Sequence, residues 1–176
     1  VSGTGLAAVA GLRALAVVGV IELAKGAVGP LVAGPGHPVA RALAGAGAVT
    51  AHNWSPLLKG AGGRGVSPAM GALAVSAPAG AGLLSAGLAI GRLLGETALG
   101  CLVADIALVP VCRRAHGRPG GMAALAVLVP IVAKRLAGNR RPSTPAVRTY
   151  LARLLLDRDT FAPPLTGLVA SREGRP

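Results

Sequence analysis

Apolar residues follow one another along this chain in long runs without a charged side chain. The longest such run covers residues 65–91, and another covers residues 97–104. A helix needs about 20 consecutive apolar residues to cross the hydrocarbon core of a bilayer. The pattern therefore predicts an all-α protein, a polytopic bundle of transmembrane helices.

The apolar runs divide into six predicted helical segments. They cover about residues 6–24, 38–51, 97–111 and 121–133, together with two segments within 66–94. The run 66–94 contains Pro78, Gly80 and Gly82. It forms either one kinked helix or two short helices that reverse near 77–82. Several segments are shorter than a full span, and their many small residues allow helices to approach closely in lipid.

From Lys134 onward the chain becomes polar and basic. We therefore divide it into a transmembrane domain, residues 1–139, and a basic tail, residues 140–176. The positive-inside rule places this tail in the cytoplasm. We expect it to be solvated, with a helix that lies on anionic lipid; a specific functional role is the alternative.

The helix in the tail is predicted from its start signal and its apolar face. Thr144-Pro145 is typical of a helix N-terminus, with proline at the first helical position. One apolar face then follows at helical spacing, formed by Val147, Leu151, Leu154 and Leu155. Three charged residues lie off that face: Arg148, Arg153 and Asp157.

Composition and charge narrow the class of protein. Hydrophobic residues make up 52% and charged residues 14%, and the mean hydropathy is +0.63, yet the net charge is +12. Soluble domains usually carry about 25% charged residues, and disordered chains need low hydrophobicity. A nucleic-acid binder needs basic residues on a folded polar face with a groove-reading element, and none is visible. The charge therefore indicates a membrane surface and anionic substrates, and no nucleic-acid partner.

The two cysteines and the start of the chain add little chemistry. Cys101 and Cys112 fit small buried hydrophobes better than a metal or disulfide framework. No motif for a metal or cofactor is present, so we expect no cofactor. Val1 does not open a signal peptide, and we expect an apolar helix upstream of it.

The loop of residues 52–65 carries the most chemical information. Its glycines let backbone N–H groups approach an anion closely: Gly60, Gly62, Gly63 and Gly65. Arg64 can hold a phosphate through two parallel hydrogen bonds, and Lys59 adds a mobile charge. The helix that starts at Val66 also favours anions at its N-terminus. The loop predicts a phosphate site; a flexible basic loop between helices is the alternative.

A second Gly-rich piece stands at the start of the chain, Ser2-Gly3-Thr4-Gly5. The hydroxyl groups of Ser2 and Thr4 can donate to phosphate oxygens or orient a nucleophile. A frayed terminus is the alternative interpretation.

Several of these stretches resemble motifs of the acyl-phosphate-dependent glycerol-3-phosphate acyltransferases. The family's second motif is similar to His52-Asn53-Trp54-Ser55-Pro56 followed by Gly62-Gly63-Arg64-Gly65-Val66. Its first motif resembles Ser2-Gly3-Thr4, its Asp-x-x-Lys-Gly resembles Glu22-x-x-Lys25-Gly26, and the end of its third motif resembles Arg135-Leu136-Ala137-Gly138. The order and approximate spacing agree over residues 2–138.

The resemblance implies a seven-helix fold of which about six spans are present here. It implies a multi-pass protein of the cell inner membrane whose motif loops face the cytoplasm. It implies transfer of an acyl group from acyl phosphate to the 1-hydroxyl of glycerol 3-phosphate, with neither acyl-CoA nor a metal. Arg113, Arg114 and Arg118 would then lie outside, against the positive-inside rule.

The same resemblance assigns residue roles. Ser2 and Arg64 are the catalytic candidates, and Ser2 would orient acyl phosphate. Glycerol 3-phosphate would bind to the loop around Arg64, at Gly62, Gly63 and Gly65. His52 would shape this loop or touch phosphate. The other predicted substrate-binding residues are Gly3, Thr4, Asn53, Lys59 and Gly60.

Departures from the family pattern leave two further hypotheses. Ala61 stands where the second motif has a basic residue, and the apolar stretch 128–132 stands where the third motif has His and Asn. One alternative is a non-catalytic membrane homologue that binds anionic lipid or phosphate. The other is a small transporter, which needs an ionisable group at mid-membrane. Asp105 is the candidate for that group, or else a carboxylate paired within the bundle.

Overall fold

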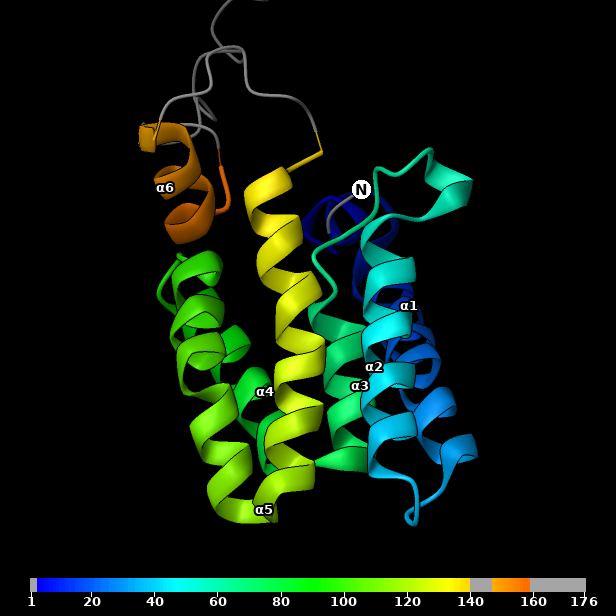
Figure 1. The fold of residues 1–176 in the computed structure, drawn as a ribbon. Coiled ribbons are helices and arrows are strands. Elements are labelled where there is room, and N and C mark those ends of the chain that lie inside the picture. The colour runs from blue at the N-terminus through cyan, green and yellow to red at the C-terminus, as the bar shows by residue number, and fades with distance from the viewer. Residues whose placement is uncertain (1–2, 140–146, 159–176) are drawn as a thin grey trace, which may run out of the picture.

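The computed structural model of the protein describes residues 3–139 and 147–158, and all regular structure in these residues is helical. The helices are α1 (Gly3–Ala33), α2 (Pro38–Asn53), the short 3-10 helix η1 (Pro56–Leu58), α3 (Val66–Ser76), α4 (Pro78–Leu93), α5 (Thr97–Ala137) and α6 (Val147–Leu156). They pack into a bundle with α6 at one end (Figure 1). The all-α prediction is confirmed.

Within residues 3–139 and 147–158, two helices are long and apolar enough to cross a membrane. These are α1, through Ala16–Ala33, and α5. The apolar helix α3 has only 11 residues. At about 1.5 Å per residue it reaches roughly half of a hydrocarbon core of about 30 Å. Because α3 is this short, the loop before it must reach into the bundle to meet the first residue of α3.

Helix α5 turns back on itself at Gly117. The dihedral angles there (φ 66°, ψ −160°) are not helical and separate an arm of residues 97–116 from an arm of residues 118–137. The two arms run side by side (Figure 1). A positive φ strains any residue with a Cβ, so glycine is what makes this turn possible. The sequence predicted separate segments 97–111 and 121–133, but Arg113 and Arg114 lie within the first arm.

The other predicted segments differ from the helices mainly at their ends. The run 66–94 forms two helices separated at Ala77, so the two-helix alternative is the correct one. Helix α1 continues to Ala33 and does not end near Lys25. It ends where Gly34 adopts a positive φ of 74°. Lys25 is tolerated within the helix because it pairs with Glu22 at 2.9 Å.

Small residues bring the helix backbones into direct contact, as the sequence predicted. A methyl group on Gly26 of α1 would overlap the carbonyl oxygen of Pro68, and one on Gly71 of α3 would overlap that of Leu23. Gly87 of α4 and Gly100 of α5 meet in the same way. Between the helices lies an apolar core whose largest members include Val49, Leu73, Leu84, Leu108 and Ile131.

The tail helix α6 forms where the sequence predicted a helix. Ala152 and Arg153 are buried, and α6 packs on α5. Val147 and Leu151 of the predicted apolar face are exposed. Arg153, which lies off the predicted apolar face, is thus buried against α5, and the expectation that the helix lies on anionic lipid stays a prediction. The predicted N-cap at Thr144 falls outside the described residues.

Candidate functional site

The Gly-rich loop lies at the end of the bundle that also carries α6 (Figure 1). Because α3 is short, residues 59–65 descend from η1 into the bundle to reach it. Gly62 and Gly65 are buried, and so is Asn53 at the end of α2. The loop is therefore packed into the protein and does not extend freely into solvent.

Glycine is required in this loop by its packing against the end of α2. A side chain on Gly62 would overlap the backbone carbonyl of His52, and one on Gly63 would overlap the His52 ring. Gly65 has a φ of 73° and lies against the Asn53 side chain. These contacts explain the glycines by their packing against α2, and the predicted approach of their N–H groups to an anion stays a prediction.

The backbone N–H groups of the loop fall into two sets. Those of Lys59, Gly60 and Ala61 donate to carbonyl oxygens of residues 55–58, at 2.9 to 3.1 Å. Within the described part of the chain, the N–H groups of residues 62–65 have no hydrogen-bond partner. The second set thus has no hydrogen bond within the described residues, whereas Gly60 uses its N–H in the local turn.

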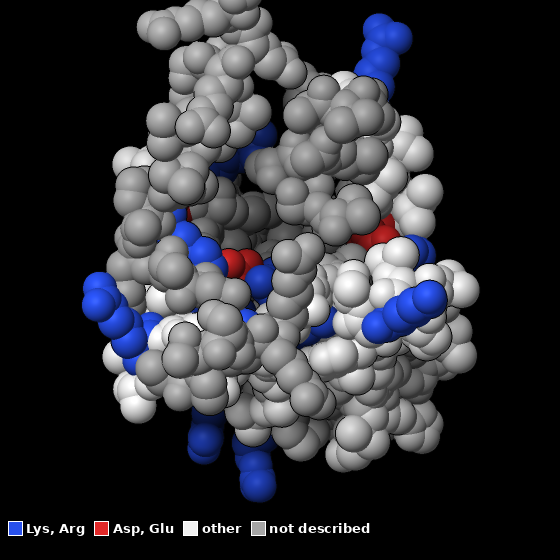
Figure 2. Space-filling model, turned by 90° about the horizontal axis from the view of Figure 1, so that it is seen from above, with Lys and Arg blue, Asp and Glu red and all other residues white. Residues whose placement is uncertain are grey.

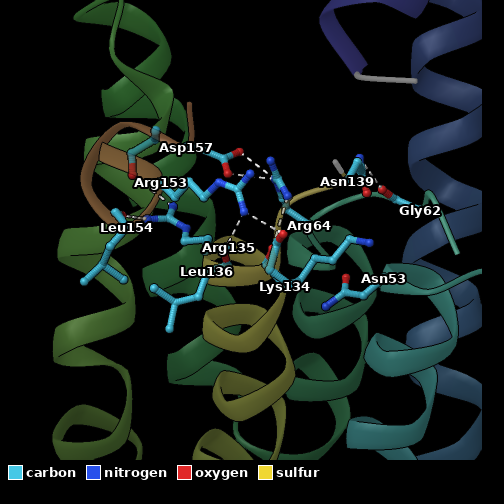
Figure 3. Close-up of polar contacts among 12 residues, drawn as sticks. Asn53, Gly62, Arg64, Lys134, Arg135, Leu136, Asn139, Arg153, Leu154 and Asp157 are labelled. Carbon is cyan, nitrogen blue, oxygen red and sulfur yellow. Dashed lines mark hydrogen bonds and ion pairs between the residues drawn. The ribbon is translucent and has the colours of Figure 1, made fainter. Parts of the chain in front are cut away.

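The C-terminal end of α5 holds the loop in place (Figure 3). Lys134 Nζ donates to the Gly60 carbonyl at 3.0 Å, and Asn139 Nδ2 donates to the Gly62 carbonyl at 3.2 Å. Asn53 Nδ2 donates in turn to the Pro130 carbonyl of α5 at 2.8 Å. The stretch that resembles the third motif therefore meets the stretch that resembles the second.

Arg64 bridges α5 and the chain after α6. Its Nη1 donates to the Lys134 carbonyl at 3.2 Å, and its Nε lies 2.8 Å from the Asp157 carboxylate. Both side chains remain partly exposed, Arg64 at 29% and Asp157 at 25%. The predicted phosphate-binding arginine thus already holds an anionic group, the carboxylate of Asp157.

Three further cations gather around Arg64. Lys134 is fully buried, with Nζ 5.1 Å from the centre of the Trp54 ring, a cation–π contact. Arg135 donates to the carbonyls of Ala98 and Leu154 at 3.0 and 2.9 Å. Seen from this end of the bundle, Lys and Arg side chains recur across the face, and Asp and Glu are few (Figure 2).

Arg153 completes this group of cations from α6. It donates to the carbonyls of Leu136 and Ala137, at 3.0 and 2.7 Å. These carbonyls belong to the last turn of α5, which lacks helical partners for them. Arg153 therefore caps α5 and fastens α6 to the bundle.

His52 forms a second pair beside the loop. Its Nδ1 lies 2.7 Å from Glu22 Oε2 of α1. A carboxylate only accepts hydrogen bonds, so Nδ1 carries a proton and, in a neutral ring, Nε2 is left as an acceptor. Gly63 packs against that same ring. The structure thus joins Glu22, from the stretch resembling Asp-x-x-Lys-Gly, to the Gly-rich loop.

The remaining predicted site residues are placed as follows. Ser2 lies outside the described residues. Gly3 and Thr4 stand in the first turn of α1, so the loop expected there is helical from Gly3 onward. The start of α1 lies at the same end of the bundle as the Gly-rich loop (Figure 1). Lys59 is exposed and adopts a left-handed conformation, with φ 50°.

Three of the buried residues of α5, all singled out in the sequence, have separate outcomes. Cys101 and Cys112 are buried, as predicted. Asp105 is 2% exposed, and neither carboxylate oxygen has a hydrogen-bond partner among the described residues. The hydrogen-bonded pairing considered for Asp105 is therefore not observed within that part of the chain.

The fold and site define a helical protein in which a Gly-rich, cation-lined loop lies beside apolar helices. A family model described as glycerol-3-phosphate acyltransferase matches residues 1–141. This match covers most of the chain, so the chain belongs to the glycerol-3-phosphate acyltransferase family, as its motifs indicated. Members of this family act on glycerol 3-phosphate and an acyl donor, and they are typically bound to membranes.

The match includes the whole Gly-rich loop and the end of α5, and it stops before α6. A search of curated proteins found no match. A search of solved structures found none either.

Proposed function

We propose that this protein transfers an acyl group from acyl phosphate to the 1-hydroxyl of glycerol 3-phosphate. The products are lysophosphatidate and inorganic phosphate. The observation that carries the proposal is Arg64 in a buried Gly-rich loop, next to N–H groups of residues 62–65 that have no described partner. A guanidinium and several backbone N–H groups together suit a phosphate monoester.

The chemistry requires little beyond positioning, because acyl phosphate is already activated. The hydroxyl oxygen attacks the carbonyl carbon, the bond from that carbon to the phosphate oxygen breaks, and the hydroxyl proton passes to a phosphate oxygen. The protein must hold two phosphate groups and bring hydroxyl and carbonyl together. Arg64 and the loop bind glycerol 3-phosphate, and Lys134 and Arg135 add positive potential where negative charge develops.

Binding of the substrate phosphate involves a competitor that belongs to the protein. The Asp157 carboxylate accepts a hydrogen bond from Arg64 Nε. A phosphate oxygen would otherwise bind to this N–H group. Carboxylate and phosphate use the same guanidinium donors. Glycerol 3-phosphate therefore binds by displacing Asp157 from Arg64.

We also propose a membrane arrangement of about six spans within residues 1–139, with the Gly-rich loop and the tail in the cytoplasm. Large apolar side chains on α1, α2 and both arms of α5 support it, because they are exposed and lipid would cover them. They include Val17, Val20, Val28, Leu31, Val32, Leu43, Val103, Ile106, Leu125 and Val129. Large exposed apolar surface marks contact with a membrane or another protein.

One observation favours a second candidate function. The stretch 128–132, which stands where the family's third motif has His and Asn, is apolar and lies within α5. A homologue that binds phosphate or anionic lipid without catalysis would keep Arg64 and lose those side chains. Product formation separates the two candidates.

The test is an assay of lysophosphatidate formation in membranes that contain the protein, with acyl phosphate or acyl-CoA as donor. We expect product from acyl phosphate only. Arg64→Gln should lower kcat/KM roughly 100-fold, because two charge-assisted hydrogen bonds to phosphate are lost. Arg92→Gln is the matched control, since Arg92 is exposed at the end of α4. A folded protein that forms no product from either donor refutes the acyltransferase proposal.

A further inference from the structure

Helix α6 meets the candidate site from outside the stretch that the family model matches. The match ends at residue 141, and α6 begins at Val147. The helix packs on α5, at the end of the bundle that carries the Gly-rich loop (Figure 1). We call residues 147–158, which are α6 and the two residues after it, the cap. The cap is thus an addition to the matched domain, and it lies where the loop lies.

Arginines attach the cap to the bundle. Arg153, which is 3% exposed, donates to two carbonyls of the last turn of α5, at 3.0 and 2.7 Å. Arg135 of α5 donates to the Leu154 carbonyl at 2.9 Å. The pair of Arg158 with Glu96 adds little, because Glu96 is 47% exposed and exposed ion pairs contribute little to stability. We therefore expect the position of α6 to depend mainly on Arg153.

The cap buries little apolar surface. The large side chains of Val147 and Leu151 are exposed, and the buried apolar residue of α6 is the small Ala152. Helix α6 has only 10 residues, and isolated helices shorter than about 12–15 residues are marginally stable in water. A few hydrogen bonds therefore hold the cap, and a ligand that competes for one of its contacts can release it.

The cap meets the candidate site through Asp157. This residue follows α6 directly and adopts a left-handed conformation, with φ 55°, which aspartate tolerates better than most residues. Its N–H donates to the Arg153 carbonyl at 3.0 Å, and its carboxylate accepts from Arg64 Nε at 2.8 Å. The carboxylate thus reaches Arg64 because α6 is docked, and it occupies an N–H group that suits a phosphate oxygen.

We propose that residues 147–158 are an autoinhibitory cap, which closes Arg64 while α6 is docked and opens when a phosphate group replaces Asp157. The proposal rests on the proposed binding of glycerol 3-phosphate by Arg64. Loss of the Asp157 contact leaves α6 attached mainly by Arg153, so the helix undocks more readily. Closure lowers the apparent affinity for phosphate, because only the open fraction of molecules binds it.

The first test measures binding of glycerol 3-phosphate to the purified full-length protein in a phosphate-free detergent buffer, by titration calorimetry. Arg153→Gln should lower the dissociation constant about threefold to tenfold, because α6 undocks and takes Asp157 away from Arg64. The lost positive charge would by itself weaken anion binding, so a direct electrostatic effect has the opposite sign. Arg118→Gln is the matched control. It removes an exposed arginine at the opposite end of the bundle and should bind as the native protein does.

A double variant tests whether Arg153 and Asp157 act through the same cap. Asp157→Asn alone should lower the dissociation constant by a factor similar to that of Arg153→Gln. The variant with both changes should bind no more tightly than the tighter of the two single variants, because the cap is already open. Two independent effects would instead multiply, and that result would contradict a shared cap.

Amide hydrogen exchange in the native protein measures release of the cap without any substitution. Saturation with inorganic phosphate or glycerol 3-phosphate should speed exchange within residues 147–156 about tenfold and leave the exchange of α4 unchanged. This readout decides the question even where Arg153→Gln does not fold. Unchanged exchange within residues 147–156 overturns the proposal.

Binding outcomes separate the cap from the proposed reaction, because neither measurement requires turnover. Release of the cap by phosphate without any lysophosphatidate product refutes the acyltransferase proposal alone. The cap proposal is overturned if a folded Arg153→Gln binds glycerol 3-phosphate no more tightly than the native protein. It is overturned as well if neither protein binds glycerol 3-phosphate, because Arg64 then offers no site to inhibit.

Discussion

At the residue scale, the cations of the candidate site are held mostly by neutral oxygens. Lys134, Arg135 and Arg153 all donate to backbone carbonyls, which orient a side chain without cancelling its charge. Arg64 in addition pairs with a carboxylate, that of Asp157. The site therefore keeps a positive potential where a phosphate would bind, and Asp157 is the anion that offsets part of it.

Replacing Asp157 should strengthen substrate binding. In Asp157→Asn the carboxylate that competes for Arg64 becomes a neutral amide, so the KM for glycerol 3-phosphate should fall about threefold to tenfold. Steady-state kinetics with varied glycerol 3-phosphate measures this change. Glu96→Gln is the matched control, because it removes the carboxylate of the exposed Glu96–Arg158 pair. A higher KM in Asp157→Asn would mean that Asp157 positions Arg64 for the substrate.

The Glu22–His52 pair should act on substrate binding through the loop. Glu22→Gln weakens the contact that fixes the His52 ring against Gly63, so the KM for glycerol 3-phosphate should rise about tenfold while kcat changes little. The comparison is Lys25→Gln, which breaks only the exposed Glu22–Lys25 pair and should leave both parameters unchanged. A large fall in kcat at unchanged KM would instead give His52 a part in the chemical step.

The sequence located the loop but not the residues that surround it. Glycines around one arginine are visible in a single stretch of chain. Its partners in α5 and after α6 are 70 to 93 residues away, as in Arg64–Lys134 and Arg64–Asp157. No local pattern marks such contacts. For Lys134, the signal in the sequence is the basic pair Lys134-Arg135, which stands directly after the last apolar segment.

At the element scale, every predicted apolar segment corresponds to a helical stretch, and the errors lie at the ends. Charged residues were interpreted as boundaries near Lys25 and near Arg113. Lys25 stays in the helix because Glu22 lies one turn before it. Arg113 and Arg114 stay in the helix because Gly117 alone makes the turn. In both places a charged residue near the end of an apolar run predicted a helix end that the structure does not have. Lys25 is paired with Glu22 within the helix, and the chain turns only at Gly117.

Gly71 tests the close packing of α1 on α3. Gly71→Ala places a methyl group on the Leu23 carbonyl, and overpacking of this kind should destabilise the fold by about 1–3 kcal/mol. Gly82→Ala in α4 meets no atom within 4 Å, so it should be neutral or slightly stabilising. Thermal unfolding in detergent measures both. Equal stability of the two variants would contradict the contact.

At the scale of the whole molecule, the two ends of the bundle differ in how charge is balanced. The described carboxylates that pair with cations all do so toward the end that carries α6. At the opposite end, around Gly117, Arg113, Arg114 and Arg118 are exposed. The sequence showed the excess of positive charge but not its division between two ends, since the division depends on how the helices stack.

The proposed orientation can be tested by labelling cysteines introduced at the two ends. Leu57→Cys lies in the exposed turn η1, and Gly36→Cys lies in the turn between α1 and α2, where a side chain meets no atom within 4 Å. In intact cells lacking the outer membrane, a membrane-impermeant maleimide should label only the Gly36→Cys variant. Both native cysteines are buried, so background labelling should be low. Labelling of Leu57→Cys alone would reverse the orientation.

The contacts between glycines and carbonyl oxygens also bear on which parts of the protein can move. Backbones that meet as Gly26 and Pro68 do, or Gly87 and Gly100, cannot slide past each other by a fraction of a turn without collision. Helices α1, α3, α4 and the first arm of α5 therefore form a rigid frame. Helix α6 is held against the second arm of α5 by side chains such as Arg135 and Arg153. We infer that a substrate reaches Arg64 by movement of α6, while the helices beneath it stay together.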